Sequence, residues 1–465
     1  MKKTLTILLI PIVLIIAFII LVQSCVVSNE KYDYDDLSEY IKLPNYKTYT
    51  YTLEEDAIKQ AIGTYLMQYS SEYTIKRGDR VNVDLRFYDR IDPETSLKGD
   101  EITELFSDDI WLENVATPTV DGGYQISYQI ENGIIGSKLK ATVTKEYTLA
   151  DDFYVESYRG RTVFVDITIN NKECELGDVL LASYTGYYLD ENGNILQENG
   201  KDKTFDSSEK SSFYIGSNLA VEDFENGLIG MTVGVEKDIY ATFPEDYEHD
   251  KTIAGKKVLF RTKVTAIYTP PVYNDAFVQT YFSTFTTVKE FEDALLKEYT
   301  LSVVYDYISA NCQILKYPDY EYNEAADQLA EIEGTWADQY GMTLDSYIQS
   351  TYGMTRDAYI KSNMKTEMIF YALRNDLGSS VIPTDEELQD EKDSLIEYYK
   401  TYYMQNEGLT ESVALSEAKD FVATLGDSYV YEQVLYTKID NLMPTLVKTT
   451  TVKTEKDYVF DAKTE

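Results

Sequence analysis

Hydrophobic and polar positions alternate between residues 177 and 268 in the way that β-strands require. The alternation is clear in 177–186 (GDVLLASYTG) and again in 254–268 (AGKKVLFRTKVTAIY), where apolar side chains fall on one face. A turn-rich segment, 190–193 (DENG), and a short apolar helix at about 221–228 lie between these strands. The pattern predicts a small, mostly β domain.

Similar segments occur earlier in the chain, which indicates an internal repeat. The aligned pairs are GDRVNVDLRF (78–87) with GDVLLASYTG (177–186), ENGIIGSKL (131–139) with ENGLIGMTV (225–233), and RGRTVFVDITI (159–169) with AGKKVLFRTKV (254–264). Two copies of one antiparallel sheet domain account for all three pairs. We call residues 78–171 copy 1 and residues 172–268 copy 2.

Helical periods replace the strand pattern after the linker Thr269–Val272 (TPPV). Thr384, with Glu387 three residues later, forms a capping box that begins one helix. The pattern predicts helices at about 274–283, 287–314, 321–340, 343–350, 355–376, 384–406, 411–424 and 428–442. We therefore expect an α+β chain whose sheet domains are followed by an all-α region at 269–453 and a flexible tail at 454–465.

A tether and a capped helix are expected at 26–77, ahead of the first sheet domain. Within 43–70, Thr52 and Glu55 form a second capping-box pattern, and apolar residues then recur at helical spacing. The sequence therefore predicts an amphipathic helix that begins at Thr52.

Composition excludes several classes of function. The net charge of −38 argues against nucleic-acid partners, because phosphate binding needs clustered Lys and Arg. Three cysteines and the single His249 are too few for a disulfide scaffold, a zinc site or a Ser-His-Asp triad. Cys174 and Cys312 either pair or stay as free thiols, and we favour free thiols. The 43 tyrosines suit adaptable binding surfaces, or reflect a compositional habit of secreted proteins.

The N-terminus has the pattern of an export signal. Lys2 and Lys3 precede an apolar run that ends in Leu-Val-Gln-Ser-Cys (21–25). This ending resembles a bacterial lipobox, which implies a signal peptide at 1–25, lipidation of Cys25 and attachment to the outer face of the cell membrane. The alternative is an uncleaved anchor helix, since the run approaches the ~20 residues that span a bilayer.

The second sheet copy resembles an FKBP-type peptidyl-prolyl isomerase domain, and most of all the one in trigger factor. It has the strings Gly-Met-Thr-Val-Gly (230–234) and Phe-Pro-Glu-Asp-Tyr (243–247) in the expected order. The resemblance implies tandem FKBP-like domains, isomerisation of X-Pro bonds without a cofactor or metal, and a helical C-terminal region that binds unfolded polypeptides. The basic ribosome-docking loop of trigger factor has no counterpart, so the expected clients are proline-containing or unfolded exported polypeptides.

The resemblance also implies a set of site residues. Phe224 is expected at the pocket floor, Val221 at the entrance with its N–H toward a substrate carbonyl, Asp206 at the rim, and Tyr247 as a hydroxyl donor. The expected walls are Tyr184, Phe205 and Phe260. Copy 1 has Leu85, Ile130 and Val165 where copy 2 has Tyr184, Phe224 and Phe260, so we read it as degenerate.

The pocket of copy 2 departs from the family pattern at two places. Ser211 stands where an aromatic residue is common, and Glu222-Asp223 replaces Pro-Gly. The leading hypothesis is a membrane-tethered extracytoplasmic foldase. The alternative is a non-enzymatic lipoprotein that binds peptides or a partner on an FKBP-like scaffold, which these departures favour.

Overall fold

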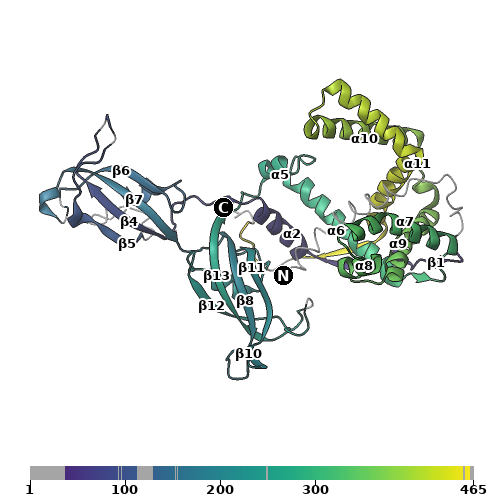
Figure 1. Cartoon of the computed structure of the whole chain (residues 1–465), viewed down its shortest axis with the longest axis horizontal. Helices are drawn as coiled ribbons and strands as arrows, with labels where there is room; N and C mark the ends of the chain where they lie inside the picture. Colours follow the sequence, from purple (N-terminus) through teal and green to yellow (C-terminus); the bar gives the residue numbers. More distant parts are fainter. Residues whose placement is uncertain are drawn as a thin grey trace. The chain divides into compact units, whose positions relative to one another are not determined.

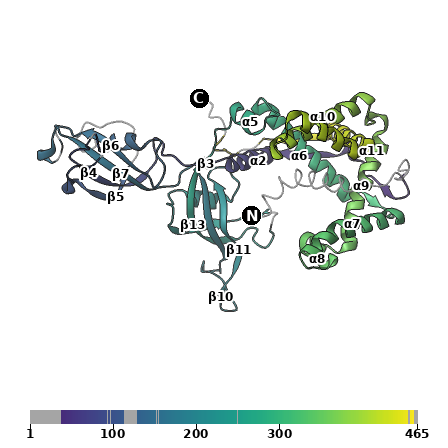
Figure 2. The same cartoon turned by 45° about the horizontal axis from the view of Figure 1, so that its top comes forward.

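The computed structural model describes residues 37–92, 94–95, 97–112, 129–151, 153, 155–247, 250–453 and 456–460. Expectations for the export signal, Cys25 and His249 lie outside these residues. These residues form two compact units: 37–54 with 292–452, and 55–291 with those described from 453 onward. Figures 1 and 2 show that helices dominate the first unit and sheets the second.

The helical unit joins segments that lie far apart in sequence. Strand β1 (Ile41–Lys42) pairs antiparallel with β14 (Gln313–Ile314), and β2 (Thr50–Glu54) pairs parallel with β15 (Lys448–Val452). The short 3-10 turns η1 (Tyr46–Thr48) and η4 (Gly378–Ser380) also belong here. The helices are α6 (Val288–Asn311), which begins just before the unit, α7 (Asp319–Gln339), α8 (Leu344–Tyr352), α9 (Arg356–Leu377), α10 (Asp385–Asn406) and α11 (Glu411–Leu446).

Two sequence signals for helix ends are confirmed in this unit. The Thr384 hydroxyl accepts a bond from the Glu387 N–H, and the Glu387 carboxylate accepts from the Thr384 N–H at 2.8 Å. Gly426 has φ 81° and interrupts α11, so the two helices predicted at 411–424 and 428–442 meet at a kink there.

Among the described residues, the sheet unit contains a four-stranded and a five-stranded antiparallel sheet, and four strands of each follow the same order. The first has the order β5-β4-β7-β6, and the second β11-β8-β13-β12, with β3 (Ser71–Glu72) paired to the end of β13. In the first sheet the strands are β4 (Val81–Tyr88), β5 (Ser107–Leu112), β6 (Thr142–Thr148) and β7 (Thr162–Lys172), with η2 (Thr103–Leu105) and η3 (Glu156–Tyr158) beside them. In the second they are β8 (Val179–Tyr188), β11 (Thr204–Tyr214), β12 (Glu236–Thr242) and β13 (Lys257–Thr269), with the small hairpin β9 (Gln197–Glu198) and β10 (Lys201–Asp202). The mixed α+β fold is therefore confirmed.

The joint between the sheets is a buried ion pair. The Lys172 ammonium is fully buried and donates to Asp178 at 2.6 Å, and it lies 4.5 Å from the centre of the Tyr73 ring. Burial raises the pKa of Asp178, although the Lys172 charge opposes this shift. Because a buried charge without a partner is costly, this pair fixes the chain where it passes from β7 to β8.

The helix expected before the first sheet is α2 (Glu55–Gln68), but its predicted start was wrong. Thr52 lies in β2, opposite Thr450 of β15, and so cannot cap the helix. Strand pairing with β15 replaces the local capping interaction here. The sequence around Thr52 could not predict this, because β15 lies at the far end of the chain. The aromatic residues of α2 and of α5 (Asp275–Tyr281) pack together, with Tyr69 stacked 4.1 Å from Tyr281.

Part of the tail predicted to be flexible is in fact packed. Residues 456–460 lie against the second sheet, where the Val459 N–H donates to the Gly216 carbonyl at 3.0 Å.

Cys174 is buried and Cys312 is half-buried, and both are free thiols. Burial raises the pKa of the Cys174 thiol to about 12. Because the thiolate is the reactive form, this thiol is unreactive at neutral pH.

Candidate functional site

Three strands and one short helix bring the predicted aromatic residues of copy 2 together. Tyr184 comes from β8, Phe205 from β11 and Phe260 from β13, while Phe224 comes from α4 (Glu222–Leu228). The helix can approach the sheet closely because Gly227 has no side chain: a Cβ there would lie 2.3 Å from Ile239 of β12. The strand order places β8 at the centre, between β11 and β13.

The rings of these residues form one continuous cluster. Phe224 lies 4.8 Å from Phe260 between ring centres, and Phe260 lies 5.5 Å from Phe205 and 5.9 Å from Tyr184. The pairs meet edge to face, which is a favourable geometry for aromatic rings. Phe224, Phe260 and Tyr184 are buried, whereas Phe205 is only half-buried. The structure thus brings all four expected ring residues together.

Glycine at position 186 makes room for the Phe205 ring. A Cβ on Gly186 would lie 2.5 Å from the tip of that ring, closer than any real contact. The aligned position in copy 1 is Phe87, a buried core residue. This glycine therefore distinguishes the two copies physically.

A charged hydrogen bond orders the rim of the cluster. The Tyr184 hydroxyl donates to the Asp206 carboxylate at 2.6 Å. Burial, and then this bond, raise the pKa of the Tyr184 phenol, so it remains a donor at neutral pH. The Tyr247 ring lies 4.8 Å from Phe243, and burial raises the pKa of its hydroxyl as well. Asp206 and Tyr247 thus lie beside the rings, and the roles expected for them stay predictions.

Val221 precedes α4 as its N-cap residue, with extended backbone angles. Its carbonyl accepts bonds from the Phe224 and Glu225 N–H groups, which anchors the first turn. Within the described part of the chain, the Val221 N–H itself donates to no acceptor. It is therefore available to donate to a bound carbonyl.

Glu225 fixes the loop that leads to Val221. Its buried carboxylate accepts backbone N–H bonds from Gly216 and Ala220, both at 2.9 Å, and from Asn218 at 3.3 Å. Desolvation raises its pKa, and these backbone bonds counter the shift. Glu225 positions the pocket rim without facing the rings, and the sequence analysis missed it.

The departures from the family pattern have local roles. The Asp223 carboxylate accepts a bond from the Thr242 N–H at 2.9 Å and so ties α4 to the end of β12. Glu222 and Asp223 are exposed, and Ser211 pairs with Ala182 within the sheet. These residues therefore leave the ring cluster in place.

Comparison with known proteins agrees with this geometry. Residues 170–267 match the family of FKBP-type peptidyl-prolyl cis-trans isomerases. The second sheet is an FKBP-type peptidyl-prolyl isomerase domain in a trigger factor-like protein. The chain is 27% identical to the trigger factor of Caldicellulosiruptor bescii over 357 residues, which cover 67% of this chain and 77% of that protein. It is 30% identical to the trigger factor of Staphylococcus saprophyticus over 187 residues, or 38% of this chain and 40% of that protein.

Two solved structures show weaker overall similarity. A structure of the trigger factor chaperone is 19% identical, with a TM-score of 0.21, and the match covers 59% of this chain and 62% of that one. A structure of the three FKBP domains of wheat FKBP73 is 11% identical, with a TM-score of 0.16, and the match covers 42% and 90%. TM-scores this low do not show that the whole chain shares the fold of either structure.

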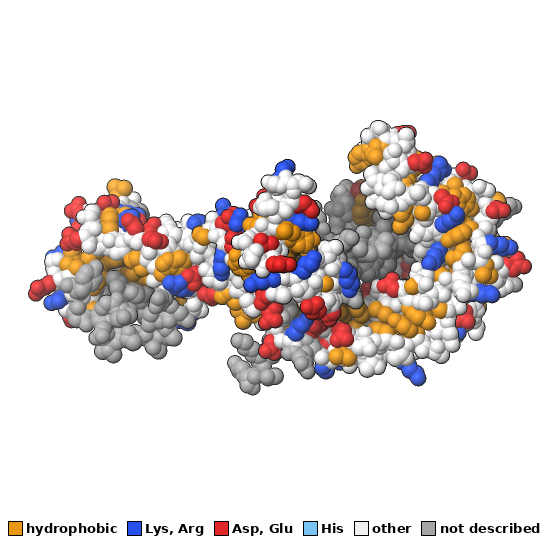
Figure 3. Space-filling model, turned by 90° about the horizontal axis from the view of Figure 1, so that it is seen from below, with side chains coloured by type: hydrophobic (Ala, Val, Ile, Leu, Met, Phe, Trp, Pro, Cys, Tyr) orange, Lys and Arg blue, Asp and Glu red, His pale blue; other side chains and the backbone are white. Residues whose placement is uncertain are grey.

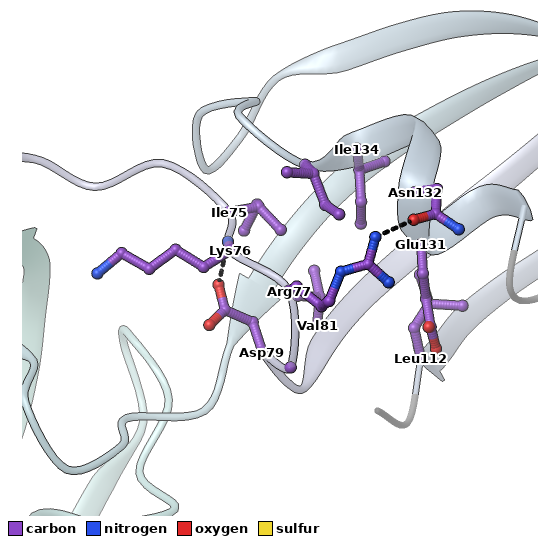
Figure 4. Close-up of a pocket in the computed structure, with 11 residues that line it drawn as sticks. Ile75, Lys76, Arg77, Asp79, Val81, Leu112, Glu131, Asn132 and Ile134 are labelled. Atoms are coloured by element: carbon purple, nitrogen blue, oxygen red, sulfur yellow. Dashed lines mark hydrogen bonds between the residues drawn. The ribbon is translucent and has the colours of Figure 1, made fainter. Parts of the chain in front are cut away.

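The first sheet lacks the features of the isomerase domain. Its aligned residues Leu85, Ile130 and Val165 are all buried aliphatic side chains. A small pocket at its edge has a volume of about 20 Å³, room for one water molecule. Figure 4 shows Arg77 reaching across this pocket to Asn132, at 2.8 Å, while Asp79 turns back to the Lys76 N–H. This pocket is too small for a prolyl ring with its neighbours.

Sequence reasoning missed two rings of the isomerase domain. Phe213 lies 5.0 Å from Phe224, and Phe243 lies 6.0 Å from Phe205 and 6.3 Å from Phe260. Both are buried. The Phe-Pro-Glu-Asp-Tyr string contained the signal for Phe243.

Among the described residues, no cluster of three or more His, Cys, Asp or Glu is placed to hold a metal ion.

Proposed function

We propose that this protein is a membrane-tethered foldase that isomerises X-Pro bonds in exported proteins and holds their unfolded segments. The observation that carries the proposal is the ring cluster of Tyr184, Phe205, Phe224 and Phe260 beside the Val221 N–H, which donates to no acceptor among the described residues. The family match and the trigger factor relatives support the isomerase and chaperone parts.

The ring cluster suits a reaction that needs no nucleophile. Rotation about an X-Pro bond costs ~18–20 kcal/mol, because the planar amide loses its resonance as it twists. The twisted amide is less polar than the planar one, so apolar aromatic walls destabilise the ground state relative to the twisted state. A bond from the Val221 N–H to a substrate carbonyl would hold the peptide while the prolyl ring enters between the aromatic rings.

The helical unit offers surfaces for holding unfolded chains. Tyr398 and Tyr402 of α10 are 64% and 45% exposed. They line an open surface depression of about 580 Å³, together with Ser394, Glu397, Thr401, Gln405 and Asn406. On the face in Figure 3, hydrophobic side chains reach the surface among acidic and basic ones. Tyrosine combines apolar area with a hydroxyl, which favours adaptable contacts with many peptides.

The proposed location rests on the sequence of the N-terminus. The lipobox-like ending at Cys25 supports lipid attachment. Separately, within the described residues, which begin at 37, no helix is both long and apolar enough to cross a bilayer. Labelling with a radioactive fatty acid in a bacterial host tests this part. We expect the wild-type chain to incorporate label and Cys25→Ala to incorporate none; label on the variant would contradict the proposal.

A refolding assay separates the two activities. The substrate is a denatured protein whose slow refolding phase is limited by a proline isomerisation. Catalytic amounts of the chain should speed that phase, and Phe224→Leu should abolish the effect while aggregation is still suppressed. Tyr398→Ser with Tyr402→Ser should weaken suppression alone, whereas the matched change Tyr240→Ser, at an exposed tyrosine of β12, should do neither. A Phe224→Leu chain that is as fast as wild type would refute the isomerase assignment.

The alternative, a binding lipoprotein without enzymatic activity, rests on the acidic pair Glu222-Asp223. The bond from Thr242 to Asp223 gives one of these residues a structural role, which weakens that reading. Saturable binding of proline peptides without faster isomerisation would favour it instead.

A further inference from the structure

We propose that residues 457–460 are a positioning segment of the isomerase site, which rests on the isomerase function proposed above. This segment, the C-terminal strap, holds the loop 214–220 that leads to Val221. Loop, strap and pocket helix all belong to the sheet unit. The inference starts from hydrogen bonds that link the strap, the loop and α4 in series.

The strap bonds to the loop backbone at two points. The Val459 N–H donates to the Gly216 carbonyl at 3.0 Å, and the Asn218 side-chain amide donates to the Asp457 carbonyl at 3.0 Å. Gly216 and Asn218 both have left-handed backbone angles, with φ of 88° and 55°. Asn218 in particular pays a conformational cost there, so the loop needs external contacts to keep this shape.

The same loop residues are bonded to the pocket helix on their other side. The N–H groups of Gly216 and Asn218 donate to the Glu225 carboxylate, and Glu225 directly follows the floor residue Phe224. Gly216 therefore connects the strap with α4 through its two backbone groups. A shift of the strap moves the frame that sets the direction of the Val221 N–H.

Side-chain packing reinforces the backbone bonds. The Phe460 ring lies 6.0 Å from Tyr214 and 6.4 Å from Tyr273, and Tyr458 is buried. Helix α2 closes the other side, because Gly63 lets it approach so closely that a Cβ there would lie 3.2 Å from Phe460 and 3.4 Å from Ser217. Lys456 adds an ion pair of 2.7 Å with Asp56 of α2.

The contacts also explain why glycine stands at position 216. A Cβ there would lie 2.5 Å from Leu176 and 3.0 Å from the Cβ of Val459, in addition to the strain of its positive φ. The close approach of strap and loop thus depends on a missing side chain. No signal in the sequence of 454–465 predicted this, because the partner residues lie more than two hundred positions earlier.

The strap bonds to the loop at the pocket rim and not to the four rings of the cluster. Its loss should therefore change substrate binding more than the chemical step. A rim donor that binds ground state and transition state alike changes KM and leaves kcat nearly constant. Val459→Pro removes the N–H that bonds to Gly216, while Val459→Leu keeps it and serves as the matched control. Phe460→Ala loosens the packing with the backbone bond intact and provides a second test.

The experiment measures kcat and KM of the full chain for a proline peptide, with hydrogen exchange of residues 214–221 followed by mass spectrometry. For Val459→Pro we expect KM to rise about three- to tenfold, the equivalent of one lost hydrogen bond, with kcat within about twofold of wild type. Exchange in 214–221 should speed up while β8 and β13 stay protected. Phe460→Ala should show a smaller shift of the same kind, and Val459→Leu should behave as wild type.

Three results would overturn the inference. They are unchanged exchange in 214–221, faster exchange with an unchanged KM, and a fall in kcat that tracks loss of protection across the whole domain. A wild-type chain that does not isomerise the peptide contradicts the proposed function itself, and the exchange data then still show whether the strap holds the loop.

Discussion

Replacing Phe224 by leucine removes the ring at the pocket floor and keeps a buried apolar side chain. The ring has three aromatic neighbours: Phe260 at 4.8 Å, Phe213 at 5.0 Å and Tyr184 at 6.3 Å. Each aromatic pair is worth about 0.5–1.5 kcal/mol beyond the area that it buries. Because the three pairs share one ring they are not additive, and we expect a loss of about 2 kcal/mol in the free energy of unfolding.

The effect on catalysis should be larger than the effect on stability. A loss of about 2 kcal/mol leaves a typical domain mostly folded, since native stabilities are about 5–15 kcal/mol. Without the ring, the pocket loses the flat floor against which the prolyl ring packs. We expect kcat/KM for a proline peptide to fall at least about tenfold, measured in a protease-coupled assay, with the fold checked by circular dichroism.

The internal repeat supplies a matched control for this substitution. Ile130 is the aligned buried residue of the first sheet, and Ile130→Ala should cost about 2–5 kcal/mol there without changing isomerisation. If Phe224→Leu keeps wild-type kcat/KM, or if Ile130→Ala lowers it equally, the assignment of the floor is refuted.

Three further predictions concern hydrogen bonds and charges. Tyr184→Phe keeps the ring and removes the donor to the rim carboxylate, so unfolding in urea should show a loss of about 1–3 kcal/mol, with kcat/KM reduced less than in Phe224→Leu. Lys172→Met leaves the buried Asp178 without its cation, and should cost about 3–5 kcal/mol in the same measurement; a cost below about 1 kcal/mol would contradict the buried pair. The bond from Lys438 lowers the pKa of Glu387 to about 2, from 4.5, so this carboxylate stabilises the helical unit above pH 4.5 and progressively less as the pH falls toward 2. Thermal unfolding of Glu387→Gln should therefore differ from wild type at pH 7 and converge with it near pH 2.

Elements with strong local signals could be predicted from the sequence. The capping box at Thr384 and the break at Gly426 are set by residues adjacent in sequence, and both are confirmed. The alternation in β8 and β13, with the repeat, was enough to predict two antiparallel sheets. The four rings that meet in the second sheet were expected only from its resemblance to an FKBP-type domain.

Features that depend on distant partners could not be predicted in this way. Thr52 carries a capping signal, yet β15 recruits it into a strand from almost four hundred residues away. The same holds for the packed strap around Val459, whose contacts are with the loop before α4. Glu225 lies in the aligned repeat, but its role appears only when three backbone N–H groups converge on it. Local sequence patterns predict helices and strands. Where a residue such as Thr52 suits either a helix cap or a strand, contacts with distant residues decide which one forms.

The central claim is that the second sheet catalyses X-Pro isomerisation, and exchange NMR of a proline peptide tests it without a coupling protease. The isomers of the free peptide interconvert over tens to hundreds of seconds. Substoichiometric amounts of the whole 465-residue chain should bring this exchange to a rate at which cis and trans signals show cross-peaks, and the Phe224→Leu variant should not. A folded wild-type chain that leaves the exchange rate unchanged, while still binding the peptide, would contradict the claim and identify the domain as a binding module.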